Sequence, residues 1–178
     1  HAKNSLTQRA IGPESYAITE LDVSHLRNGD VAGLALLNLP YAWIGIVKNN
    51  NGHVLQFYNQ QEEMRISVET SNHTVWLRAH CNFDTDTGKL SYSLDGKEFQ
   101  EIGGEILLPY QLRTFQGVRY ALFNFNTQGK EGGFADFNRF EVLEPRCKGL
   151  TRPIPYNQII TLKSIADSSV LVLSLIHI

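Results

Sequence analysis

The stretch VRYALFNFNTQGKEGGFADFNRFEV, residues 118–142, decides the fold class. Apolar residues alternate with other residues in Tyr120–Phe125 and again in Phe134–Val142, which is the period of half-buried strands. The intervening Asn126–Gly133 is rich in glycine and amide residues, as loops that join paired strands often are. We therefore predict a β-hairpin with a long tip and interpret it as the closing hairpin of a β-sandwich.

Upstream of this stretch, short runs with strand-like patterns follow one another, with turn signals about every 8 to 12 residues. These runs are Tyr16–Val23, Val31–Leu37, Tyr41–Lys48, His53–Tyr58, Met64–Val68, Thr74–Phe83, Lys89–Leu94 and Lys97–Ile102. Alternation fades around Ile106–Arg119, where Pro109 favours a connector with one short helical turn. Since no convincing amphipathic helix is present, we predict an all-β antiparallel sandwich of about nine to eleven strands.

Composition narrows the classes of function. With 178 residues, 42% of them hydrophobic, the chain is long enough for one domain with a sizeable core. A net charge of −2 and a pI near 6.3 supply no basic field for phosphates, so we expect no nucleic-acid partner. No apolar run reaches the about 18 to 20 residues that a spanning helix needs, so we expect no membrane partner.

The composition changes after Glu144. We predict a β-sandwich domain over 1–144, a proline-rich linker over 145–157 and the truncated start of a following β domain over 158–172. The final LSLIHI, residues 173–178, can be encoded by a transposase end sequence used for sequencing libraries. We therefore interpret it as a cloning or sequencing scar in an assembled metagenome fragment, with a natural apolar tail as the alternative.

Five stretches, taken in order, resemble one known family. They are LTQRAIGP (6–13), GDVAGLALL (29–37), PYAWIGIVK (40–48), VWLRAHCNFDTDTGKLSYSLDGKEFQEIG (75–103) and RYALFNFNTQGKEGGFADFNRFEV (119–142). Together they resemble the concanavalin A-like β-sandwich, a jelly roll, at the C-terminus of family 43 glycoside hydrolases, the β-xylosidases and arabinofuranosidases.

The resemblance carries further expectations. The family sandwich usually begins upstream of the LTQR-like segment, so the chain is expected to lack its first strand or two. A catalytic propeller domain with the acid and base carboxylates would precede His1, and the segment from Gly149 onward looks like the start of a β-trefoil-like domain. The resemblance also favours a bacterial parent enzyme that is periplasmic or secreted.

Catalytic and metal-binding chemistry leave few signals in the chain. Glycoside hydrolysis needs two carboxyl groups flanking the scissile bond, and no strand shows the alternating carboxylates of a sandwich glucanase, so we expect no catalytic residue here. Asp84 and Asp86 in DTDTG are similar to the first half of a calcium loop, and Asp136 is a second candidate ligand. We expect no cofactor, with a structural calcium ion as the alternative. Cys81 shares a strand face with apolar residues and is predicted to be buried.

Sugar binding needs aromatic faces with polar groups nearby. Tyr41 and Trp43 share one strand face, and Trp76 shares another with Arg78 and His80, so either set is a candidate carbohydrate-binding surface. Strand aromatics are more often core residues, which is the alternative for both sets. Near the hairpin tip, Asn124, Asn126 and Gln128 are candidate partners for sugar hydroxyls, or else satisfy the local backbone.

We predict a non-catalytic accessory module of a xylan-degrading glycoside hydrolase. It would bind xylan or arabinoxylan oligosaccharides, or shape the active-site rim of the catalytic propeller, with Gly129–Gly133 as its functional end. One alternative is a purely structural sandwich that packs on the propeller, and a second is a hydrolase that acts on xylosides or arabinosides by itself.

Overall fold

The structure is a computed structural model that describes residues 4–110, 117–144, 160–163 and 171–174, the last two stretches as backbone only. These residues form β1 (Asn4–Arg9), β2 (Glu14–Asp22), β3 (Asp30–Leu37), β4 (Ala42–Asn49), β5 (Gly52–Asn59), β6 (Met64–Thr70), β7 (Thr74–Asn82), β8 (Thr87–Ser93), β9 (Gln100–Leu107), β10 (Arg119–Asn126), β11 (Phe134–Leu143), β12 (Ile160–Lys163) and β13 (Leu171–Ser174). The described ranges contain no helix, and hence none with the length and apolarity to cross a membrane.

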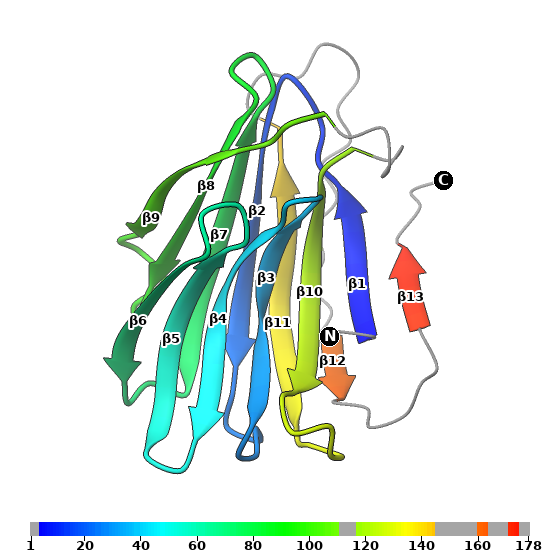
Figure 1. The fold of residues 1–178 in the computed structure, drawn as a ribbon. Helices are drawn as coiled ribbons and strands as arrows, with labels where there is room; N and C mark the ends of the chain where they lie inside the picture. The colour runs from blue at the N-terminus through cyan, green and yellow to red at the C-terminus, as the bar shows by residue number, and fades with distance from the viewer. Residues whose placement is uncertain (1–3, 111–116, 145–159, 164–170, 175–178) are drawn as a thin grey trace.

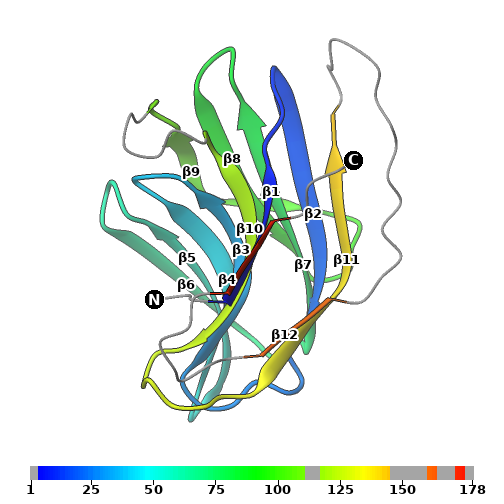
Figure 2. The same ribbon diagram turned by 90° about the vertical axis from the view of Figure 1, so that its right-hand side faces the viewer.

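The strands form two sheets packed face to face. One sheet has seven strands in the order β13-β1-β10-β3-β4-β5-β6, and the other has six in the order β12-β11-β2-β7-β8-β9. Figure 1 looks onto the seven-stranded sheet with the six-stranded sheet behind it, and Figure 2 shows the two layers side by side. The predicted all-β sandwich is confirmed.

The core lies between the sheets because apolar residues occupy alternate strand positions. In β7 the pattern is strict: Val75, Leu77, Ala79 and Cys81 are buried, whereas the residues between them are partly exposed. In the seven-stranded sheet, side chains such as Ile44 and Phe57 enter the same core. The buried position predicted for Cys81 is confirmed. Burial raises the pKa of its thiol to about 12, so Cys81 stays a protonated packing residue at neutral pH.

The predicted hairpin at residues 118–142 is wrong in its pairing, although both of its strands exist. β10 lies in the seven-stranded sheet between β1 and β3, and β11 lies in the six-stranded sheet between β2 and β12. Thr127–Gly133 therefore crosses from one layer to the other. Packed sheets lie about 10 Å apart, a gap that a loop of this length spans easily. The β4–β5 hairpin and the β7-β8-β9 meander are as predicted.

Other differences from the sequence expectations are local. β1 was not predicted because its sequence NSLTQR has no alternation of apolar and polar residues. In the structure Leu6 and the polar Thr7 and Gln8 are all buried. The third strand of the meander was expected over Lys97–Ile102, but β9 starts later and continues to Leu107, with positive φ at two successive glycines inside it. The helical turn expected within 106–119 falls in part on 111–116, outside the described residues.

The segments after Glu144 also extend the sheets where they are described. β12 pairs antiparallel with β11, and β13 pairs parallel with β1. The predicted linker over 145–157 lies outside the described residues, as do four of the six residues interpreted as a scar. The division into domains remains a prediction.

Candidate functional site

The outer face of the seven-stranded sheet carries a group of aromatic side chains. The register places one residue from each of six neighbouring strands in a row across this face, in the order Thr7, Ala121, Ala35, Trp43, Tyr58 and Arg65. Around this row lie the residues that we call the aromatic cluster: Tyr41, Trp43, Tyr58, Phe123 and Phe125.

Trp43 is the centre of the aromatic cluster. Its ring lies edge-on to the ring of Phe123, with centroids 5.7 Å apart, and its centroid is 6.2 Å from that of Tyr58. Tyr58 in turn lies 5.8 Å from Tyr41. Aromatic pairs favour such separations. Because the rings cover one another, Trp43 keeps only 9% of its surface exposed.

The contact between Trp43 and Phe123 bridges β3, which lies between their strands. It requires small side chains on β3, and Gly33 and Ala35 supply them. Gly33 pairs with Gly45, and a Cβ added at either glycine would overlap a backbone carbonyl of the neighbouring strand. Because neither glycine has a side chain, no atoms rise from the sheet at this position between the strands that carry Trp43 and Phe123.

Hydrogen bonds hold the backbone of Tyr41 in the aromatic cluster. Gln60 fixes Tyr41 through two hydrogen bonds, since the Gln60 amide donates to Tyr41 O (3.0 Å) and the Tyr41 amide donates to Gln60 Oε1 (3.2 Å). Burial and the neighbouring Tyr58 raise the pKa of Tyr41, so its hydroxyl remains a hydrogen-bond donor at neutral pH. A surface with packed rings and phenolic donors suits a sugar, which offers C–H groups to rings and hydroxyls to donors.

The shared face predicted for Tyr41 and Trp43 is confirmed, but sequence reasoning missed most of their neighbours. Phe123 and Phe125 are two residues apart on β10, so their side chains share one face of that strand. Only the register across β3 shows that Phe123 meets Trp43, and the sequence carries no signal for that register. Arg65 at the end of the row was missed for the same reason.

Trp76, Arg78 and His80 lie on the opposite side of the molecule, on the outer face of the six-stranded sheet. They share a face of β7, as predicted. The two predicted aromatic sets are therefore separated by the whole thickness of the sandwich (Figure 2) and cannot line one site.

Trp76 and Arg78 each pack on a local partner. A Cβ added at Gly96 would lie 2.8 Å from the Trp76 ring, so the β8–β9 turn sits directly against the indole. The Arg78 guanidinium lies 4.4 Å from the centroid of Phe99, and Arg78 Nε donates to Ser91 Oγ at 3.0 Å. These contacts favour a packing role for both side chains.

His80 is held in the same way. Its ring stacks on Tyr16 with centroids 4.2 Å apart, and Nε2 lies 2.9 Å from Glu14 Oε1. The Tyr16 hydroxyl donates to the same carboxylate oxygen at 3.0 Å. The carboxylate, imidazole and phenol thus satisfy one another on this face.

The three amide residues near the β10–β11 loop have different surroundings. Asn124 points into the sandwich and is 1% exposed. Asn126 Nδ2 donates to Asp30 Oδ1 (2.9 Å) and Asn28 O (3.2 Å), and its Oδ1 accepts from the Gln128 amide (2.8 Å). Gln128 alone among the three is exposed.

Asp30 anchors the β10–β11 loop. Its carboxylate is fully buried and accepts hydrogen bonds from the backbone amides of Arg27 and Gly133, both at 2.7 Å, besides the one from Asn126. A Cβ added at Gly132 would overlap this carboxylate, so only glycine allows the loop to approach so closely. One end of the loop is therefore fixed to the start of β3.

The candidate metal ligands lie far apart. Asp84 and Asp86 are in the β7–β8 turn, at the end of the sheet where Glu14 pairs with Asn82. Asp136 pairs with Asp22 at the other end of β2. At about 3.3 Å per residue the two ends of β2 are roughly 26 Å apart, so these carboxylates cannot share an ion. Within residues 4–110 and 117–144, no three His, Cys, Asp or Glu side chains are arranged to hold a metal.

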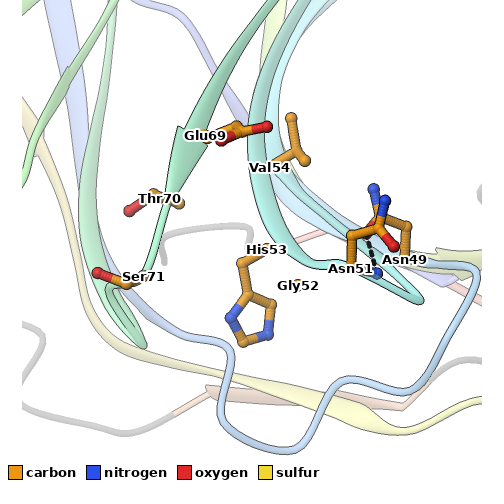
Figure 3. Close-up of a pocket in the computed structure, with 8 residues that line it drawn as sticks. All are labelled: Asn49, Asn51, Gly52, His53, Val54, Glu69, Thr70 and Ser71. Atoms are coloured by element: carbon orange, nitrogen blue, oxygen red, sulfur yellow. Dashed lines mark hydrogen bonds between the residues drawn. The ribbon is translucent and has the colours of Figure 1, made fainter.

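A pocket of about 340 Å³ lies where the β4–β5 turn meets the end of β6 (Figure 3). Its lining is mostly polar: Asn49, Asn51, Gly52, His53, Val54, Glu69, Thr70 and Ser71. His53 is buried, its ring lies edge-on to that of His73 at 5.2 Å, and burial lowers its pKa. The pocket offers amide, hydroxyl and carboxylate groups but no broad aromatic surface, so it is a weaker sugar site than the aromatic cluster.

The two packed sheets with a shared core form a β-sandwich that is antiparallel except for the β1–β13 pair. Residues 1–143 match the family model of the β-xylosidase C-terminal concanavalin A-like domain, and the chain belongs to this family. The domain is a C-terminal module of GH43 enzymes. None of the curated proteins matches the chain.

Solved structures of GH43 enzymes are similar to the chain. A bifunctional GH43-CE protein from Bacteroides eggerthii is 33% identical with a TM-score of 0.73, over 80% of this chain and 19% of that one. A GH43 glycoside hydrolase engineered to display both endo-xylanase and exo-arabinofuranosidase activity is 26% identical with a TM-score of 0.67, over 77% and 30%. The chain thus spans less than a third of either relative. A functionally unknown protein from Saccharomyces cerevisiae, 15% identical with a TM-score of 0.57 over 76% and 71%, shares the fold alone.

Proposed function

We propose that the chain is a non-catalytic accessory module of a xylan-degrading GH43 enzyme and that it binds xylan or arabinoxylan chains on the outer face of its seven-stranded sheet. The observation that carries the proposal is the aromatic cluster around Trp43. Its rings come from β4, β5 and β10 and from the segment before β4, and they contact one another. Trp43 and Phe123 are 9% and 4% exposed, so the partly exposed Tyr41, Tyr58 and Phe125 would offer most of the ring surface to a sugar. Catalysis would reside in the propeller domain of the parent enzyme.

The opposite outer face is a poorer candidate. There Trp76, Arg78 and His80 already pack on the turn, ring and carboxylate beside them. A sugar would have to displace those contacts before it could use the same groups, and it would gain little in exchange.

The experiment uses the two tryptophans, which are the only ones in the sequence and lie one on each outer face. In Trp76→Phe, Trp43 is the sole emitter, and we expect its fluorescence to change when xylohexaose is added. The matched variant Trp43→Phe leaves Trp76 as sole emitter, whose emission should stay constant. Titration calorimetry on both variants and the unchanged chain then gives affinities.

A response of Trp76 and none of Trp43 would move the site to the six-stranded sheet. If no heat and no emission change accompany xylohexaose or an arabinoxylan oligosaccharide, the binding proposal fails. Circular dichroism and a melting curve for each variant establish that the fold is intact in either case.

A purely structural module that packs on the propeller is the second candidate, and exposed apolar side chains favour it. Leu37, Leu39 and Tyr110 are 40%, 46% and 77% exposed. Asn38 Nδ2 donates to Pro109 O at 3.0 Å, which brings the β3–β4 loop and the segment after β9 together at one end of the sandwich. Exposed apolar groups of this kind mark interfaces. Analytical sedimentation of the unchanged chain and of the variants Leu39→Ser and Tyr110→Ser would test this candidate. It is favoured if the unchanged chain self-associates, each substitution abolishes the self-association, and no sugar binds.

A further inference from the structure

Arg65 stands at the edge of the aromatic cluster in a fixed orientation. It lies on β6, the edge strand of the seven-stranded sheet, next to Tyr58 in the register. Its Cζ is 4.9 Å from the centroid of the Tyr58 ring, and its Nη1 donates to Gln56 Oε1 at 2.5 Å. Gln56 Nε2 in turn donates to Ser67 Oγ at 3.2 Å. The guanidinium group is therefore held by two side chains of β5 while Arg65 remains exposed.

This guanidinium has no carboxylate partner in the described part of the chain, where the ion pairs are His80–Glu14, Lys89–Glu101 and Arg139–Glu141. The one acidic strand residue on the same outer face is Glu69. It is four residues further along β6, roughly 13 Å away at 3.3 Å per residue. Arg65 is thus oriented by its neighbours and has no ion-pair partner among the described residues, as is also the case for Arg78 on the opposite outer face.

The charges of the two outer faces differ in sign. By register, the described strands of the seven-stranded sheet direct Arg9, Arg65 and Arg119 outward against Glu69. Those of the six-stranded sheet direct Arg78, Lys89 and Arg139 outward against Glu14, Glu20, Asp22, Glu101, Asp136 and Glu141. The chain as a whole has a net charge of −2. The described strands that carry the aromatic cluster therefore direct more positive than negative side chains outward, which favours an anionic ligand.

We propose that Arg65 binds the carboxylate of a uronic acid unit on the glycan chain that lies over the aromatic cluster. The inference rests on the proposed function and adds the ligand class: a neutral pentose backbone with acidic side groups. A guanidinium presents paired N–H groups that match the two oxygens of a carboxylate. Because Gln56 engages only Nη1, the other N–H groups remain available, and the adjacent Tyr58 ring places the sugar within their reach.

Two roles for Arg65 make different predictions. If Arg65 only covers Tyr58, its removal weakens binding of neutral and acidic chains equally. If it receives a carboxylate, its removal affects the acidic chain alone, and the effect shrinks as salt screens the charges. The comparison of two ligands on one variant separates these roles.

The experiment compares a linear xylo-oligosaccharide with the same oligosaccharide carrying one glucuronic acid unit, each titrated into the full 178-residue chain. We expect the acidic probe to bind roughly tenfold more tightly at about 0.02 M salt, and the preference to fall towards unity at about 0.5 M. Arg65→Gln should abolish the preference and keep the affinity for the neutral probe. Arg65→Lys should retain part of it, since a lysine keeps the charge but lacks the planar fork.

Arg139→Gln is the matched control, because it removes one exposed arginine from the opposite outer face, and it should leave both affinities unchanged. Equal affinity of the unchanged chain for both probes overturns the inference and leaves the proposed function standing. A preference that survives Arg65→Gln also overturns it, since the carboxylate then binds elsewhere. Failure of both probes to bind ends the proposed function, and the inference with it.

Discussion

The two outer faces of the sandwich carry similar residues in different surroundings. Each carries one tryptophan and at least one arginine lying over an aromatic ring, Arg65 over Tyr58 and Arg78 over Phe99. On the six-stranded sheet these groups pair with immediate neighbours, and ion pairs cross the surface. On the seven-stranded sheet the rings gather into one cluster, and none of the ion pairs among the described residues lies on its outer face.

The difference arises from the strand between the aromatic groups. On the seven-stranded sheet, Gly33 and Ala35 of β3 are small enough for Trp43 to reach Phe123 over them. On the six-stranded sheet, Trp76 meets the β8–β9 turn at Gly96 instead. The neighbouring strands thus decide what a side chain contacts, and similar alternation along two strands can give one joined ring cluster or several separate local contacts.

The largest contrast between the faces should appear when each tryptophan is truncated. Trp43→Ala removes a side chain that is 9% exposed and packed among rings, so we expect a loss of about 3 to 5 kcal/mol in the free energy of unfolding. Trp76→Ala removes a partly exposed side chain and should cost about 1 to 2 kcal/mol. Urea unfolding followed by circular dichroism measures both. Equal losses would mean that the two tryptophans are equivalent packing residues.

A smaller contrast should separate the two arginines. Arg78→Ala loses the stack on Phe99 and the hydrogen bond to Ser91, at a cost of about 1 to 2 kcal/mol. Arg65→Ala should change stability by less than about 0.5 kcal/mol, as exposed surface substitutions do. The same unfolding experiment compares them, with Arg78→Lys testing the need for a planar group. A cost at Arg65 as large as at Arg78 would argue for a structural arginine on both faces.

The smallest contrast is in pH dependence. Burial lowers the pKa of His53, which lies at the start of β5 in the seven-stranded sheet, and the nearby Lys48 and His73 add to the effect. The unfolded chain therefore binds this proton more readily, so the stabilising contribution is complete above pH 6.5 and is lost as the pH falls below it. His53→Gln should reduce the fall in melting temperature as the pH is lowered below 6.5.

The six-stranded sheet should respond at lower pH. The backbone amides of Lys97 and Glu98 and the hydroxyl of Ser93 lower the pKa of Asp95 to about 2. This turn is stabilised above the unfolded value of 3.8 and loses that contribution as the pH falls towards 2. Asp95→Asn should remove this loss of stability at low pH. In the Trp43→Phe variant, the fluorescence of Trp76, which packs on the turn, should follow the change. A single pH transition that both His53→Gln and Asp95→Asn abolish would contradict the separate origins assigned to the two pH effects.

Most strands could be predicted, because apolar residues recur at every second position in them, whereas β1 lacks that pattern and was missed. Pairing could not. The β4–β5 turn is too short to leave the sheet, so its hairpin was predictable, whereas Thr127–Gly133 is long enough to join either a hairpin or two layers. Tyr41 and Trp43 were identified as sharing a face. Their partners on β10 depend on a β10–β3–β4 order, which no local pattern encodes.

The fixed end of the β10–β11 loop divides that loop into two parts with different tolerance to change. Gly132 and Gly133 cannot accept a side chain: a Cβ at Gly132 would overlap the Asp30 carboxylate, which also binds the Gly133 amide, and a Cβ at Gly133 would overlap the His25 carbonyl oxygen. Gln128–Glu131 is exposed throughout. Insertions between Gln128 and Glu131 should therefore leave the sandwich intact, which makes this segment the natural place to graft a peptide or a label.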